Sequence, residues 1–215
     1  MSWNYRISNR PSPLTQAQMA ENVDEIYAQL YSNYLWTVNA ICAVLGNMEK
    51  ESYLNPAQTE LYYPIDSNEH GYGLVQWDPA RKYKNWARAN NHSIYSGYWQ
   101  VYFLNNQSGG TEWIPTTHFP ETYDQFKHSG QTLSYLTECF LRNYERASVA
   151  TEDLESRIEY ANKWYRYIMG TDPPPEPTPE PPYPPEPPTP PDPDPSGYKR
   201  TSKINIYLRN PRLRF

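Results

Sequence analysis

A single run of prolines limits where this chain can fold. Fifteen of its 23 prolines fall between Pro173 and Pro195, accompanied by five acidic and no basic residues. Proline lacks the backbone N–H and has a fixed φ, so such a run disfavours helix and sheet and favours an extended chain. At about 3.1 Å per residue it would span on the order of 70 Å. We therefore predict a folded part over residues 1–172, a disordered acidic linker over 173–195 and a tail over 196–215.

The tail differs in charge from the folded part. Residues 196–215 contain six basic and no acidic residues, whereas residues 1–172 contain thirteen basic and nineteen acidic ones. Ile204, Ile206 and Leu208 alternate with polar residues, as in one β-strand. A single strand is not stable alone, so we expect the tail to add to a sheet of another protein. The alternatives are a basic patch for an anionic polymer and the start of a further domain.

The folded part has a mainly helical pattern with one irregular insertion. Residues 56–77 are rich in Tyr, Asp, Asn, Pro and Gly, which predicts a loop with one or two short strands in a small hairpin lobe. The fold class is therefore α+β and mainly helical. Apolar spacing predicts helices over about residues 15–30, 37–51, 78–89, 94–106, 120–128, 132–146 and 152–169.

Three local signals mark helix boundaries. Thr15 and Gln18 fit a capping box at the start of the first helix. Asp78 followed by Pro79 is typical of an N-cap and a first-turn proline. Gly170 is expected to end the last helix.

Cysteine usage and hydropathy narrow the function classes. Cys42 and Cys139 lie in apolar helical patterns, so we predict two buried thiols, with one disulfide as the alternative. Two distant cysteines without clustered histidines lack metal-ligand spacing, and we expect neither a metal nor a cofactor.

The start of the chain lacks the apolar run of a secretory signal, and no segment approaches about 18 apolar residues. We therefore expect no membrane among its partners. We also expect no nucleic acid.

The strongest candidate for chemistry is an acidic residue at the end of an apolar helix. Glu51 ends the predicted helix over 37–51, next to the Asn55-Pro56 turn and about twenty residues before a Gly- and Trp-containing loop. A carboxyl group is a useful acid near neutral pH when partial burial raises its pKa. The 21 Tyr and 7 Trp of the chain suit stacking on sugar rings as well as core packing. These features point to cleavage of a polysaccharide.

The segments around Glu51 resemble the tail lysozyme domain of bacteriophages. The shared motifs are Gly46-Asn47-Met48, Glu51-Ser52, Asn55-Pro56, Gly73-Leu74-Val75-Gln76-Trp77 and the later Asn143-Tyr144-Glu145-Arg146. The Glu-Ser-x-x-Asn-Pro and Gly-Leu-x-Gln pieces are also similar to soluble lytic transglycosylases. The resemblance covers about residues 13–170 and implies a lysozyme-like fold. It also implies cleavage of the β-1,4 bond between N-acetylmuramic acid and N-acetylglucosamine in peptidoglycan.

The resemblance implies roles for residues near the end of this helix. Glu51 would be the general acid, whereas Glu49, two residues earlier, would point elsewhere and be solvated. Ser52 and Asn55 would organise the turn through side-chain to backbone hydrogen bonds rather than touch sugar. Gly73 would provide turn geometry and room for the glycan beside the backbone.

Substrate contacts are expected from the following loop and from a late helix. Gln76 would bind an acetamido or hydroxyl group of the sugar, and Tyr72 and Trp77 would contribute to the cleft. Tyr144 would lie near the acid. A structural ion pair between Glu145 and Arg146 is an equally good interpretation of the end of that motif.

The sequence does not identify the second carboxylate that a glycoside hydrolase needs. A retaining hydrolase needs it about 5–5.5 Å from the acid and an inverting one about 6.5–9.5 Å away. Asp66 and Glu69 are the first choices, with Glu60 and Asp78 as alternatives. A lytic transglycosylase needs none, because the muramic 6-hydroxyl attacks internally.

The expected protein is a peptidoglycan glycoside hydrolase carried on a phage tail, joined to other tail proteins through its C-terminal tail. The alternatives are a lytic transglycosylase, an endolysin for host lysis, and a non-catalytic glycan-binding or structural tail protein.

Overall fold

Helix α2 (Val38–Ser52) is the centre of the fold. Thr37 caps its start by accepting a hydrogen bond from the Ala40 N–H, and every residue from Ala40 to Leu45 is fully buried. A helix that is apolar on all sides has to be covered on all sides. The position of α2 therefore follows from its sequence.

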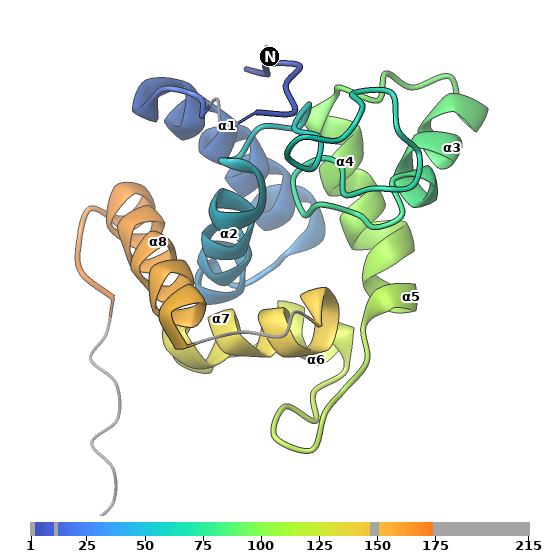
Figure 1. Cartoon of the computed structure of the whole chain (residues 1–215). Helices are drawn as coiled ribbons and strands as arrows, with labels where there is room; N and C mark the ends of the chain where they lie inside the picture. Colours follow the sequence, from blue (N-terminus) through green and yellow to red (C-terminus); the bar gives the residue numbers. More distant parts are fainter. Residues whose placement is uncertain (1–2, 11–12, 147–150, 174–215) are drawn as a thin grey trace, which may run out of the picture. The chain divides into compact units, whose positions relative to one another are not determined.

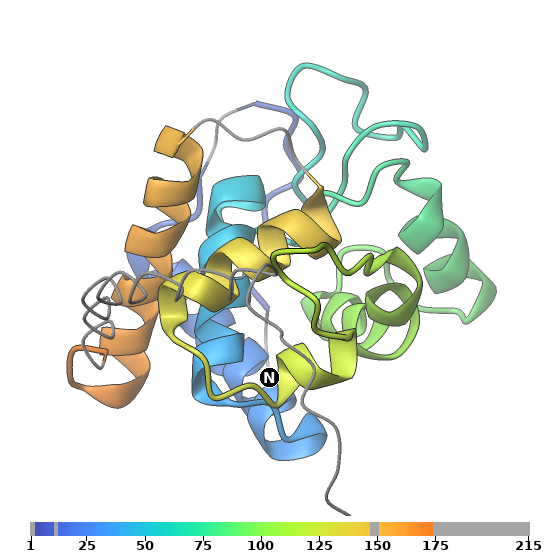
Figure 2. The same ribbon diagram turned by 90° about the horizontal axis from the view of Figure 1, so that it is seen from below.

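Two helices cover α2. Helix α8 (Thr151–Met169) packs along it (Figure 1), and helix α7 (Leu133–Phe140) crosses it, as Figure 2 shows from below. The π-helical segment η1 (Ala28–Asn33), which extends α1 (Gln16–Tyr27), also contacts α2. The aliphatic core of the protein lies between these elements.

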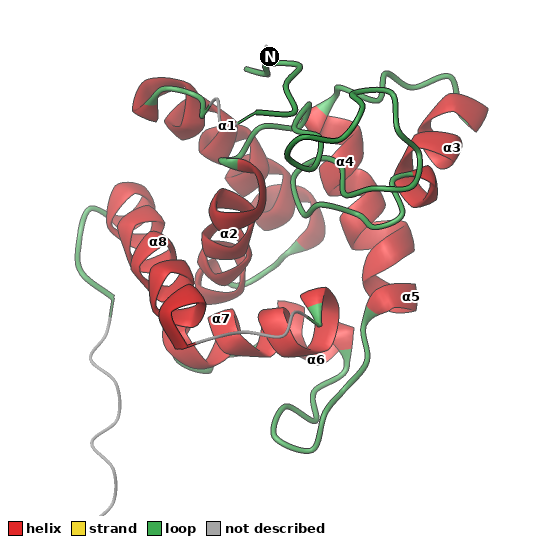
Figure 3. Cartoon of the chain, viewed as in Figure 1, coloured by secondary structure: helices red, strands yellow, loops and turns green. Residues whose placement is uncertain are grey.

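The computed structural model describes residues 3–10, 13–146 and 151–173, within a compact unit Met1–Glu176. A second unit, Pro177–Phe215, holds most of the predicted linker and the tail and lies outside the described residues. The described residues form helices and loops (Figure 3), which confirms the mainly helical fold class. The remaining helical elements are α3 (Arg81–Ala89), α4 (Gly97–Phe103), η2 (Leu104–Ser108), α5 (Gly109–Glu112), α6 (Tyr123–Lys127) and η3 (Leu141–Glu145).

Two of the three boundary signals are confirmed. Thr15 and Gln18 form both hydrogen bonds of a capping box, and Gly170 ends α8 with φ 68°. The Asp78 N-cap is wrong, because α3 is entered through Ala80, whose backbone is already helical (φ −53°, ψ −27°). A capping side chain requires an extended residue before the helix.

The predicted hairpin lobe is an irregular loop. Between α2 and α3 the chain makes no strand, only the isolated bridges of Gln58 with Ser8 and of Thr59 with Tyr72. Gln76 and three other non-glycine residues of this loop have positive φ, which interrupts the extended backbone that a strand needs. The expectation of short paired strands is therefore wrong.

Buried amide side chains hold this loop in place of strand pairing. Asn22 of α1 donates to the Leu54 carbonyl (2.9 Å). Gln100 of α4 accepts from the Leu74 N–H (2.8 Å) and donates to the Pro56 carbonyl (2.6 Å). Buried backbone groups have to be paired, and here helices supply the partners.

The expectation that Glu49 is solvated is wrong. Its carboxylate is buried between α2 and α8, where it accepts hydrogen bonds from Trp164 Nε1 (2.7 Å) and Lys163 Nζ. The close approach of the two helices depends on Gly46, since a Cβ there would lie 2.4 Å from the Arg157 carbonyl oxygen. This contact surrounds Glu49 with α8 side chains.

The prediction of two buried thiols is confirmed. Cys42 and Cys139 are free and buried, and burial raises the pKa of each thiol to about 12. Among the described residues, no helix has the length and apolar character needed to cross a membrane.

Candidate active site

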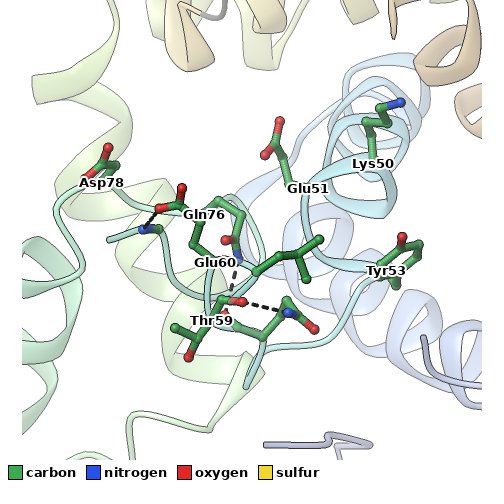
Figure 4. A pocket seen from close by; sticks show the side chains of 10 residues that line it. Lys50, Glu51, Tyr53, Thr59, Glu60, Gln76 and Asp78 are labelled. Atoms are coloured by element: carbon green, nitrogen blue, oxygen red, sulfur yellow. Dashed lines mark hydrogen bonds between the residues drawn. The ribbon is translucent and has the colours of Figure 1, made fainter. Parts of the chain in front are cut away.

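A cavity of about 470 Å³ opens between the end of α2 and the loop after it (Figure 4). This volume is within the usual range for ligand sites, about 300–1,000 Å³. Figure 4 shows Glu51 and Asp78 on opposite sides, with Gln76 and Glu60 between them. The lining residues are Lys50, Glu51, Tyr53, Gln58, Thr59, Glu60, Leu61, Gly71, Gln76 and Asp78.

Glu51 lies in the last turn of α2. The helix ends at Tyr53, which has left-handed dihedral angles (φ 55°), so the chain turns away and leaves the Glu51 side chain at the cavity. This side chain is 21% exposed. A partly buried carboxyl at a ligand-sized cavity is the arrangement that general acid catalysis requires.

Arg157 of α8 holds the Glu51 carboxylate. Its side chain is only 5% exposed, and its Nη2 donates to Glu51 Oε1 at 2.6 Å. Its Nη1 donates to Asn47 Oδ1 at 3.0 Å. Arg157 was not predicted from the sequence, because nothing local marks it and it lies 106 residues from Glu51.

Ser52 and Asn55 connect α2 to its surroundings. Ser52 Oγ lies 2.9 Å from the carbonyl oxygen of Leu74, and so links the helix end to the loop. Asn55 Oδ1 accepts from the N–H groups of Arg6 (3.0 Å) and Ala57 (3.1 Å), and its Nδ2 donates to the Arg6 carbonyl (2.7 Å). Both side chains are buried and contact backbone groups of the protein.

Gly73 lies where the loop passes close to α4. It has φ 81°, and a Cβ there would lie 2.6 Å from Gln100 Oε1. Its N–H donates to the carbonyl of Gln58 at 2.8 Å. Glycine is the residue suited to such a backbone.

Gln76 lines the cavity with part of its amide already used. Its Nε2 donates to the carbonyls of Gly73 (2.9 Å) and Gln58 (3.2 Å). Within the described ranges its Oε1 accepts no hydrogen bond from the protein. This oxygen is therefore available to accept from a hydroxyl or amide N–H of a ligand.

The three aromatic residues expected at the substrate lie deeper. Tyr72 is a core residue whose hydroxyl donates to the Ile94 carbonyl (3.1 Å). Trp77 Nε1 donates to the hydroxyl of Tyr144 (2.8 Å), and both residues are buried. Trp77 and Tyr144 line a second cavity of about 80 Å³, which shares Gln76 and Asp78 with the larger one. Two of the three therefore adjoin the site.

The structure places the first-choice carboxylates outside the cavity. Asp66 and Glu69 are exposed, and Glu69 pairs with Arg81. The alternatives, Glu60 and Asp78, both line the cavity with Glu51. The difference arises because the loop folds back, which sequence position does not reveal.

Glu145 is a further carboxyl at the site. Its expected partner Arg146 instead donates to Glu112, at 2.5 Å to the carbonyl oxygen and 3.0 Å to Oε2. Glu145 Oε1 is buried and has no hydrogen-bond partner among the residues that the structure describes. Burial and, next, the charge of Glu51 raise the pKa of Glu145 well above 4.5, against the opposing charges of Arg157 and Arg146.

The described part of the chain contains no group of three or more His, Cys, Asp and Glu side chains that could hold a metal ion. The groups that the site offers for chemistry are carboxyls, a guanidinium and an amide around one cavity.

A known protein family matches a segment that contains all of these site residues. The family model described as "Phage tail lysozyme" matches residues 21–168. "Morphogenesis protein 1" of Bacillus phage B103 is 34% identical over 158 residues, which cover 67% of this chain and 40% of that protein. The aligned segment therefore covers less than half of that relative's length.

Proposed function

The chain belongs to the phage tail lysozyme family, and from this premise we propose that it cleaves the glycan strands of bacterial peptidoglycan. The bond is the β-1,4 linkage between N-acetylmuramic acid and N-acetylglucosamine. The observation that carries the proposal is the position of Glu51, a partly buried carboxyl that lines a cavity of about 470 Å³.

Glu51 acts as the general acid. Its proton passes to the glycosidic oxygen as the bond to the anomeric carbon breaks, and the ring carbon develops oxocarbenium character. Gln76 Oε1 accepts a hydrogen bond from the sugar, and Trp77 and Tyr144 support the wall behind it. Ser52, Asn55 and Gly73 keep the loop in place relative to the helix end.

Hydrolysis requires a second carboxylate, which we assign to Asp78 or Glu60. Both line the cavity with Glu51, whereas Asp66 and Glu69 do not. Glu60 Oε2 accepts from the Gly71 N–H at 3.0 Å, which makes Asp78 the less constrained of the two. The lytic transglycosylase reaction needs neither residue.

Muropeptide mass spectrometry distinguishes the two reactions. Hydrolysis yields reducing muramic acid ends, and transglycosylation yields 1,6-anhydro ends. We expect reducing ends, and we expect Asp78→Asn to lower their yield more than Glu60→Gln. Predominantly anhydro products, unaffected by either substitution, would identify a transglycosylase.

Glu51→Gln tests the role of the acid, with Glu49→Gln as its matched control. Removing a general acid is expected to cost about 10²–10⁴-fold in lytic rate. Glu51→Gln should therefore lose activity on purified cell walls while it remains folded. Glu49→Gln should be destabilised by about 1–3 kcal/mol, because it weakens a buried ion pair, and yet keep its rate per folded molecule.

Near-normal wall clearing by Glu51→Gln would overturn the assignment. Sedimentation of the wild-type protein with walls that it never solubilises would instead indicate a non-catalytic glycan-binding protein. Circular dichroism of both variants ensures that only folded protein is compared.

We propose that the enzyme acts from the phage particle. The name of the relative, morphogenesis protein 1, supports a role in the assembled phage over release as an endolysin. The basic tail over residues 196–215 would join the enzyme to other tail proteins.

A further inference from the structure

We propose that Glu145 is a positioning residue for the general acid. With Glu51 and Arg157 it forms a cluster of two carboxyl groups and one guanidinium that shares one proton and makes it available to Glu51. This inference rests on the proposed function and adds a residue to it.

The guanidinium of Arg157 is the centre of the cluster. Its Nη2 binds Glu51 at 2.6 Å and its Nη1 binds Asn47 at 3.0 Å. Its Nε is also buried, and this N–H finds no acceptor in the described part of the chain. Arg157 therefore carries one unused donor in an environment where unpaired donors are costly.

Glu145 supplies a carboxyl oxygen that also lacks a hydrogen-bond partner among the described residues. It ends η3, and its buried Oε1 has no partner within the described ranges. It lines the smaller cavity together with Gln76 and Asp78, and these two residues also line the larger cavity beside Glu51. The two glutamates therefore approach the same pair of loop residues from adjacent cavities.

The neighbouring cations are already paired. Arg146 and Lys82 both bind Glu112 Oε2, at 3.0 and 3.1 Å. Lys50 binds Asp153 at 2.8 Å. Asp78 also lines the smaller cavity, and an acidic side chain cannot supply the positive charge that would pair with Glu145.

One guanidinium shared by two partly buried carboxyls leaves a surplus negative charge, and a retained proton removes it. Burial and the charge of Glu51 accordingly raise the pKa of Glu145, so the cluster keeps a proton at pH values where a solvated glutamate has lost it.

The shared proton explains how an acid can work beside a guanidinium. A carboxyl that faces only an arginine is stabilised as a carboxylate and is a poor proton donor. In the cluster, Glu145 can ionise against the free Arg157 Nε while Glu51 holds the proton. Glu51 then protonates the glycosidic oxygen and regains a proton from the water that attacks the sugar.

The pH profile of Glu145→Gln tests the proposal in the full chain. Removing the second carboxyl removes the shared proton, so the alkaline limb of kcat/KM should move to lower pH by about one unit or more. We expect a loss of about tenfold or more at pH 7 and a much smaller loss near pH 5. Glu138→Gln, a carboxyl that pairs with Arg142 and lines neither cavity, should leave the alkaline limb in place.

Thermal unfolding gives an independent readout. A raised pKa in the folded state means that the stability associated with protonated Glu145 is complete below its ordinary value of 4.5 and is lost as pH rises through the folded-state value. Glutamine does not titrate, so the melting temperature of Glu145→Gln should gain on the wild type as pH rises. Glu145→Asp keeps a carboxyl and should retain most of the wild-type limb.

Three outcomes separate the inference from the proposed function. If Glu51→Gln is active, the proposed function fails whatever Glu145 does. If Glu51→Gln is inactive but Glu145→Gln lowers activity equally at every pH, Glu145 only packs and the inference is overturned. An alkaline limb that does not move in Glu145→Gln overturns it as well.

Discussion

At the scale of the residue, two glutamates two positions apart have different environments. Glu49 points into the contact with α8 and is bound by Lys163 and Trp164, whereas Glu51 points to the cavity and Arg157. Side chains two positions apart on a helix lie on different faces. Partial burial was predicted for Glu51 alone. Glu49 tolerates burial because Lys163 and Trp164 of α8 donate hydrogen bonds to its carboxylate.

Asn55 carries the residue-scale prediction. It binds Arg6 and Ala57 through three hydrogen bonds and is fully buried. Asn55→Ala leaves buried backbone groups unpaired, so we expect a loss of about 2–4 kcal/mol in the free energy of unfolding. Urea denaturation measures it, with the exposed Asn90→Ala as a control expected within about 0.5 kcal/mol of wild type.

A small effect of Asn55→Ala on stability, with a large loss of rate, would contradict a turn-forming role. It would place Asn55 in contact with the sugar instead.

At the scale of the element, the close contact of α2 with α8 positions the acid. Gly46 lets the helices approach, and this approach brings Arg157 of α8 within hydrogen-bonding distance of Glu51. The same contact buries Glu49. One glycine therefore affects both glutamates.

Gly46→Ala tests this coupling. The added Cβ would lie 2.4 Å from the Arg157 carbonyl oxygen, a backbone atom that can move only with α8. We expect a destabilisation of about 1–3 kcal/mol and a reduced lytic rate in the folded fraction. The matched control is Gly110→Ala, because a Cβ there meets nothing within 4 Å.

Equal melting temperatures for Gly46→Ala and the wild type would show that α8 can shift freely. In that case Arg157 could not be regarded as held by the helix contact.

At the scale of the whole molecule, we expect the linker and the tail to be dispensable for catalysis. The compact unit spans Met1–Glu176, and the family match ends within it, at residue 168. The residues proposed for catalysis all lie inside this unit, so we expect catalysis and attachment to the particle to depend on different parts of the chain.

Truncation after Glu176 tests this division. The shortened chain should keep the melting temperature and the rate of wall cleavage of the full chain, because the described core and cavity lie within this unit. It should no longer join phage particles if the tail is the anchor. Particles that still contain the shortened protein would refute the anchor.

The helices could be predicted because their signals are local. The capping box at Thr15 and the apolar run of α2 depend on residues within a few turns of one another. The loop after α2 was predicted less well, since its backbone is held by Asn22 and Gln100 from distant helices. The Asp78 cap was wrong because α3 begins after Ala80, and Asp78 lines the cavity instead.

The amino-acid sequence predicted a proline-rich segment after a mainly helical domain, and it predicted that Glu51 lies at the end of an apolar helix. Those conclusions depend on neighbouring residues and on helical periodicity. The charged groups near Glu51 became evident only in the folded protein, because Arg157 binds it from α8 and Asp78 lines the same cavity from the loop. Electrostatic interactions depend on distance through space, and the chain sets that distance only when it folds.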